Sequence, residues 1–104
     1  MGSFEVVVTE SAFSDLREAL TYMRTVLGSP KAARDFLDSF EAQVVALETF
    51  PEGRPLVHDY ELSRMGYRWC PIGNFMLFFR VSKEARRVTV DRLLYGARDW
   101  RSLL

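Results

Sequence analysis

Cysteine and histidine, the residues most often used for disulfides, metal ligands and acid–base chemistry, are almost absent from this sequence. Its 104 residues include one cysteine, Cys70, and one histidine, His58. A single cysteine excludes an internal disulfide and any multi-cysteine metal site. No apolar run approaches the roughly 20 residues of a membrane span, and no signal peptide opens the chain. We therefore expect a small soluble cytoplasmic protein that binds no metal, cofactor or membrane.

The short motifs that mark common catalytic sites are missing as well. The sequence has no glycine-rich phosphate loop, no His-Glu-x-x-His zinc motif and no Ser or Cys nucleophile elbow. His58 precedes Asp59, and such a pair could act as a general base with its orienting acid. Adjacent side chains rarely face each other, however, so a solvated loop histidine is the favoured interpretation. Cys70 is expected to be a small core residue.

The composition is that of one folded domain. Apolar residues make up 48% of the chain and charged residues 27%, which excludes a disordered or fibrous protein. The sequence contains no internal repeat, low-complexity tract or linker. Residues 1–104 are therefore expected to form a single domain.

The charges are divided unevenly along a chain whose net charge is zero. Residues 1–62 carry five basic and eleven acidic groups, whereas residues 63–104 carry nine basic and three acidic groups. Eight of the nine cations in the second stretch are arginines, which suit bidentate contacts with carboxylates or phosphates. This distribution is explained equally well by an anionic partner for the C-terminal half and by acidic helices packed near basic strands.

Hydrophobic periodicity predicts two amphipathic helices joined by a short turn at residues 28–30. Thr9 or Ser11 caps the first helix, and the second begins after Ser29 and ends near Phe50-Pro51. Two such helices should form an antiparallel hairpin. The faces expected to be buried are Phe13, Leu16, Leu20, Met23 and Leu27 in the first helix, and Ala33, Phe36, Leu37, Phe40, Val44 and Leu47 in the second.

Four segments with strand-like patterns flank these helices. They are residues 4–8, 67–70, 75–81 and 87–95. The segment 75–81 is almost wholly apolar, which is typical of a central strand covered on both faces. Residues 51–66 show no helical period and are predicted to be a connection, part of which packs against the rest of the protein. The predicted order is β-α-α-β-β-β, an α+β fold with an N-terminal strand, a helical hairpin and a three-stranded antiparallel meander, in an antiparallel sheet with the hairpin on one face.

Arginine side chains in the predicted strands are the strongest candidates for contacts with a partner. Arg68, Arg80 and Arg92 each project from a face of the sheet, and Arg98 follows the last strand. Clustered arginines could bind phosphates or stabilise the transition state of phosphodiester cleavage. The alternative is edge-strand protection or internal ion pairing with Asp91, Asp99 and the acidic helices, which would satisfy some of the eight arginines but not all. A functional role is therefore favoured for Arg68 and Arg98.

Aromatic side chains on the strands raise the question of base stacking, as on RNA-binding sheets. Phe75, Phe79 and Trp69 are better interpreted as core residues, because the helices are expected to cover that face. Tyr67 and Tyr95 carry polar tips and could reach solvent at the margin of a site.

Three segments of the C-terminal half share a pattern with a known family. They are Gly66-Tyr67-Arg68, Gly73-Asn74-Phe75-x-x-Phe78-Phe79-Arg80-Val81, and Val88-x-Val90-x-Arg92-Leu93-Leu94-Tyr95-Gly96-Ala97-Arg98-Asp99-Trp100. Together with the valine-rich first strand and the helical hairpin ending in Leu-x-x-Phe-Pro, they resemble the RelE/ParE superfamily of bacterial toxins over nearly the whole chain.

This resemblance implies the toxin of a type II toxin–antitoxin system, of the kind that inhibits growth and stabilises plasmids. It also implies a cognate acidic antitoxin that holds the toxin inactive, in a toxin–antitoxin hetero-oligomer. The residues expected to contact the antitoxin or the cellular target are Arg68, Arg80, Arg92, Tyr95, Arg98 and Trp100.

The superfamily has two branches with different targets. RelE-like toxins cleave mRNA on the ribosome, and on that pattern Arg68 and Arg98 are the catalytic residues. Cys70 and Met76 stand where RelE-like enzymes carry Lys or Arg, and neither His nor Tyr follows Trp100. The resemblance therefore favours the ParE-like branch, which inhibits DNA gyrase without cleaving RNA. A RelE-like mRNA endoribonuclease and a degenerate, inactive member are the alternatives.

The charge division predicts how an acidic antitoxin would associate with this chain. Raising the salt concentration should slow association more than it weakens the final complex, because long-range attraction steers the encounter. Stopped-flow mixing of toxin and antitoxin over a salt series measures the association and dissociation rates. An association rate that does not depend on salt would contradict this expectation.

Overall fold

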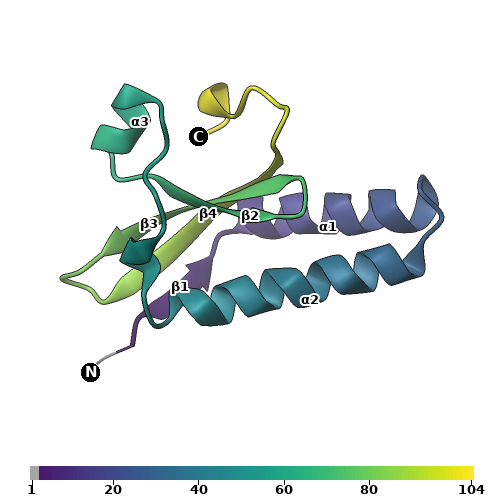
Figure 1. Cartoon of the computed structure of the whole chain (residues 1–104), viewed down its shortest axis with the longest axis horizontal. Helices are drawn as coiled ribbons and strands as arrows, with labels where there is room; N and C mark the ends of the chain where they lie inside the picture. The colour runs from purple at the N-terminus through teal and green to yellow at the C-terminus, as the bar shows by residue number, and fades with distance from the viewer. Residues whose placement is uncertain (1–2) are drawn as a thin grey trace.

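The chain folds into a four-stranded sheet with a helical hairpin packed against one face (Figure 1). The computed structural model describes residues 3–104. The elements in chain order are β1 (Glu5–Val8), α1 (Glu10–Thr25), α2 (Pro30–Leu47), the 3₁₀ turn η1 (Pro51–Gly53), α3 (Tyr60–Arg64), β2 (Arg68–Ile72), β3 (Phe75–Ser82), β4 (Arg87–Tyr95) and the 3₁₀ turn η2 (Trp100–Ser102). The predicted α+β order with its helical hairpin and meander is confirmed.

Capping residues set where the two long helices begin. The Thr9 hydroxyl accepts a hydrogen bond from the Ala12 amide at 3.1 Å, which identifies Thr9 as the cap of α1. Ser29 accepts from the Ala32 amide at 3.0 Å and is followed by proline at the first position of α2. Between the helices, Gly28 adopts a left-handed φ of 63°, as a glycine that ends a helix often does.

The sheet has the strand order β1-β4-β3-β2. Strands β2, β3 and β4 form the expected antiparallel meander, but β1 pairs in parallel with β4, with Val6 opposite Val88. The expectation of a wholly antiparallel sheet is therefore wrong for β1. An edge strand of four residues carries no local signal for its partner, so its pairing depends on where the helical hairpin returns the chain.

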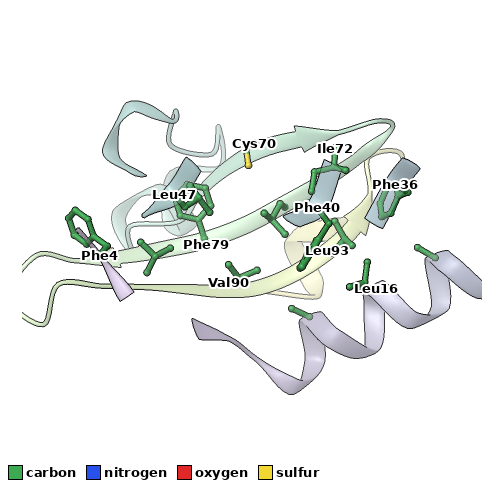
Figure 2. Close-up of a cluster of buried hydrophobic side chains, with 14 residues drawn as sticks. Phe4, Leu16, Phe36, Phe40, Leu47, Cys70, Ile72, Phe79, Val90 and Leu93 are labelled. Carbon is green, nitrogen blue, oxygen red and sulfur yellow. The ribbon is translucent and has the colours of Figure 1, made fainter. Parts of the chain in front are cut away.

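The main core lies between the helical hairpin and one face of the sheet (Figure 2). Its buried side chains include Leu16 of α1, Phe36 and Phe40 of α2, and Phe79 and Leu93 of the sheet. The predicted buried face of α2 is confirmed. The predicted face of α1 is confirmed for Leu16 but wrong for Phe13 and Leu27, which are 44% and 56% exposed, because Ala12 and Ala19 complete the buried stripe with Leu16.

A smaller core covers the opposite face of the sheet. Phe78 and Leu94 pack there with Val57, Leu62 and Tyr67. Helix α3 and the C-terminal tail lie over this face (Figure 1), and the partly buried Trp100, Leu103 and Leu104 complete the cluster. Burial on both faces of β3 confirms the prediction for the apolar strand. The prediction that residues 51–66 contain no helix is wrong for α3, a short helix capped by Asp59.

Among residues 3–104, no helix combines the length and the apolarity that crossing a membrane requires.

One ion pair links α1, the sheet and the C-terminal tail. The Asp15 carboxylate accepts hydrogen bonds from Arg92 Nε at 2.7 Å, from Arg92 Nη2 at 3.0 Å and from the Leu93 amide at 2.9 Å. Arg92 Nη1 donates a further bond to the Leu103 carbonyl at 3.0 Å. The Asp15 and Arg92 side chains are only 11% and 23% exposed, so this bidentate pair is largely protected from solvent.

Replacing Asp15 by asparagine should lower the free energy of unfolding by about 2–3 kcal/mol. The substitution leaves the Arg92 charge unpaired in a shielded position and places an amide donor against the guanidinium. Urea unfolding monitored by circular dichroism measures the loss. The matched control is Asp35→Asn, which breaks an exposed i,i+4 pair with Lys31 and should leave the free energy of unfolding nearly unchanged. An equal loss of unfolding free energy in both variants would contradict the importance assigned to the Asp15–Arg92 pair.

Candidate functional site

A groove of about 870 Å³ lies between the helical hairpin and the end of the sheet. Residues of α1, the turn between the helices, α2, the β2–β3 turn and the end of β4 line it. Helices α1 and α2 reach past the β2–β3 turn (Figure 1), so their far ends have no strand to pack against. The groove is formed by Tyr22, Met23, Leu27, Ala32, Asp35, Phe36, Ser39, Ile72, Gly73, Asn74, Phe75 and Tyr95.

Apolar and aromatic side chains dominate the groove. Phe36 packs edge-on against Phe75 at 5.0 Å between ring centroids, and Phe75 packs edge-on against Tyr95 at 5.6 Å. Tyr22 is 50% exposed and Tyr95 46% exposed, so large aromatic faces border an apolar floor. Aromatic anchors beside an apolar hollow are typical of binding surfaces.

Two glycines hold the sheet side of the groove in place. Gly73, in the two-residue turn between β2 and β3, adopts a φ of 57° that disfavours other residues. Gly96, after β4, donates its amide to the Asn74 carbonyl at 2.8 Å. A Cβ atom at Gly96 would lie 3.1 Å from that carbonyl oxygen, a tight contact, so the close approach of the two turns favours glycine. The end of β4 is thereby fixed against the groove.

Two of the predicted contact residues, Arg80 and Arg92, are held by carboxylates within the fold. Arg92 pairs with Asp15, and Arg80 donates two hydrogen bonds to Asp91 at 2.8 and 2.9 Å. A bulge opposite Phe78 and Phe79 frees Asp91 from strand pairing. Hydrogen bonds to these carboxylates raise the pKa of both guanidinium groups, so an external anion would have to displace an aspartate.

Two further predicted contact residues, Arg68 and Trp100, also make internal contacts. Arg68 donates to the backbone carbonyls of Arg54 at 2.6 Å and Glu52 at 3.4 Å, which ties β2 to the preceding connection. The Trp100 ring lies 5.2 Å from the ring of Phe78 and belongs to the smaller core. Both residues are partly exposed, so their predicted contact with a partner stays a prediction.

The last two predicted contact residues, Tyr95 and Arg98, lie together at the groove. Tyr95 lines it directly, and Arg98 lines an adjoining hollow of about 160 Å³. Arg68 lies elsewhere, because it pairs with Phe79 whereas Tyr95 pairs with Phe75, four residues away along β3. That separation is about 13 Å of strand, so Arg68 and the end of β4 at Tyr95 lie apart along the sheet.

Other side chains considered for chemistry have structural positions. Cys70 is buried in the main core, and burial raises the pKa of its thiol to about 11. Asp59 accepts a hydrogen bond from the Leu62 amide at 3.0 Å as the cap of α3, while His58 is exposed. The expectation that Tyr67 reaches solvent is wrong, because Tyr67 is 6% exposed beneath the guanidinium of Arg80.

Part of the charge division is balanced within the fold. Several cations of residues 63–104 have carboxylates of residues 1–62 within 4.0 Å. These pairs are Lys83 with Glu52, Arg87 with Glu5, Arg92 with Asp15 and Arg101 with Asp59. Within the described residues 3–104, the Arg98 guanidinium has no hydrogen bond or ion pair. Internal pairing thus accounts for much of the basic surplus, and Arg98 stays open to a partner.

No three His, Cys, Asp or Glu side chains of the described residues are grouped closely enough to hold a metal ion.

The groove itself was not expected from the sequence. Leu27 and Met23 read as core residues, and Asn74 read as a turn residue. The one available signal was that the apolar face of the first helix continues to Leu27, beside the helix end at Gly28, further than a short sheet could cover. That signal is weak, because exposed apolar residues at helix ends are common.

Solved structures share this fold at low sequence identity. A chain of the chromosomal ParDE toxin–antitoxin system from P. aeruginosa has a TM-score of 0.70 and 18% identity, covering 89% of this chain and 96% of that chain. The toxin–antitoxin complex RelBE2 from Mycobacterium tuberculosis gives a TM-score of 0.60 and 15% identity, covering 94% of this chain and 97% of that chain. Likeness at these identities establishes the fold alone.

Sequence comparison establishes the family. No curated protein sequence matches the chain. Residues 6–100 match the family described as the ParE toxin of the type II toxin–antitoxin system parDE, as the strand motifs and the Arg-Asp-Trp segment predicted. Because the match spans nearly the whole described chain, from β1 to the start of η2, this protein belongs to the ParE toxin family of type II toxin–antitoxin systems.

Proposed function

We propose that this toxin inhibits DNA gyrase by binding it, and that a cognate antitoxin keeps it inactive by filling the groove between the helical hairpin and the sheet. The observation that carries the proposal is the match of residues 6–100 to the ParE toxin family, the branch that the sequence resemblance links to gyrase. The proposed action is binding, without chemistry performed by the toxin.

The contacts of the chemically capable side chains support a non-enzymatic action. A ribonuclease needs cations free to hold the phosphate and a group able to move a proton. Arg80 and Arg92 are each held by an aspartate through two hydrogen bonds, and the Cys70 thiol is buried and protonated at neutral pH.

The groove supports an antitoxin as the partner that occupies it. Its apolar floor and half-exposed tyrosines suit the apolar face of an amphipathic helix, a common way in which peptides bind a groove. The structures that share the fold come from the ParDE system and from the RelBE2 toxin–antitoxin complex. An acidic antitoxin also complements Arg98 at the end of the groove, since this guanidinium has no carboxylate partner in the described chain.

Purified toxin should inhibit DNA supercoiling by gyrase at micromolar concentration. Supercoiling of relaxed plasmid, with toxin shown to be folded by circular dichroism, measures this. Adding one equivalent of antitoxin should restore supercoiling, and topoisomerase I should be unaffected as a control. Full gyrase activity with folded toxin would overturn the gyrase assignment, and cleavage of translated mRNA that is lost in Arg68→Ala and Arg98→Ala would replace it with the ribonuclease alternative.

A charged substitution in the groove should weaken antitoxin binding, while the same substitution beside it should not. Leu27→Asp places a carboxylate on the apolar lining and should raise the dissociation constant at least about tenfold. Val26→Asp is the matched control, because Val26 is an exposed apolar residue beside Leu27, just after α1, but does not line the groove. Isothermal titration calorimetry measures both. Equal affinities would show that the antitoxin binds elsewhere.

A further inference from the structure

We infer that the groove and the adjoining Arg98 hollow form one continuous site for a single antitoxin segment, in which Arg98 binds an acidic side chain and fixes the position of that segment. The inference rests on the proposed function, because it assigns the antitoxin to the groove. It adds that the antitoxin segment must carry a negative charge and that this charge must lie at Arg98.

The two hollows are joined by shared walls. Tyr22, Phe75 and Tyr95 line both the groove and the smaller hollow that Arg98 borders. A segment lying on the apolar floor therefore reaches Arg98 across the rings of Tyr22 and Tyr95 without leaving the surface. Apolar anchoring and charge recognition are thus placed next to each other.

Arg98 is the cation at this site whose guanidinium is free to bind a carboxylate. Asp35 in the groove is paired with Lys31, and Asp15 in the hollow is paired with Arg92. Within residues 3–104, the Arg98 guanidinium makes no hydrogen bond or ion pair, although it borders the same hollow as Glu18. A guanidinium fork binds a carboxylate bidentately, and that geometry fixes direction as well as charge.

The backbone holds Arg98 at a defined distance from the groove. The Arg98 amide donates to the Tyr95 carbonyl at 3.0 Å, and the Gly96 amide donates to Asn74 on the groove wall. Arg98 therefore belongs to a turn fastened to the groove, rather than to a loose tail. Half-exposed tyrosine rings beside it would be covered by the bound segment, and their covering strengthens an ion pair by excluding water.

The same geometry describes the partner segment. Residues three or four apart lie on one face of a helix, so an apolar anchor and an acidic residue one turn apart would meet the groove and Arg98 together. Glu18 on the far side of the hollow would repel that acidic residue. Arg98 thus favours the acidic segment and Glu18 opposes it, which gives two substitutions with opposite expected effects.

The test measures binding of the full-length antitoxin encoded beside the toxin gene to full-length toxin variants by calorimetry. Arg98→Glu should raise the dissociation constant at least about 30-fold, since it opposes like charges in a covered site. Arg101→Glu is the matched control, because Arg101 is an exposed arginine three residues away that does not line either hollow, and it should change affinity less than about threefold. Glu18→Gln should tighten binding.

The outcomes separate this inference from the function on which it rests. Restoration of Arg98→Glu binding by exchanging one acidic residue of the antitoxin for arginine would support the ion pair directly. If wild-type toxin binds the antitoxin and Leu27→Asp weakens binding, but Arg98→Glu behaves like Arg101→Glu, the inference is overturned while the groove assignment stands. If wild-type toxin does not bind the antitoxin, both are overturned.

Discussion

The ion pair between Asp15 and Arg92 is the interaction on which the arrangement of this fold depends. Its carboxylate comes from α1 and its guanidinium from β4, and the same guanidinium holds the Leu103 carbonyl of the C-terminal tail. Three segments distant in the chain therefore meet at one group. The tail in turn places Trp100 over Phe78 and completes burial of the second face of the sheet. A cation that would suit an anionic partner is thereby used for architecture.

The groove follows from the way the helical hairpin is held against the sheet. With α1 fixed near its start by Asp15, the far ends of both helices extend beyond the β2–β3 turn (Figure 1). Tyr22 and Leu27 are left exposed there, and the turn at Gly73 forms the opposite wall. Apolar surface that no strand covers is what a folded partner segment can bury. The proposed antitoxin-binding surface is thus the part of the hairpin that its own sheet does not reach.

Local features of the fold could be predicted, and features that depend on distant neighbours could not. Thr9, Ser29 and Gly28 mark helix ends through contacts within a few residues, so the sequence is enough to place them. The parallel pairing of β1 depends on β4, and the burial of Tyr67 depends in part on Phe78 and Leu94; all of these lie more than ten residues away in the sequence. Helix α3 was missed because five residues are too few to show a helical period.

The sequence by itself determined the family, the α+β order and the candidate residues. Strand motifs, capping residues and apolar periodicity depend only on residues that lie close together in the sequence. Only the tertiary structure decided which arginines are available to a partner. Arg80 and Arg92 face carboxylates brought to them by a bulge and by α1, whereas Arg98 lines a hollow beside the groove and forms no ion pair within the described residues. The reason is physical: charge belongs to a residue type, but its neutralisation depends on what folding places within a few ångströms of it.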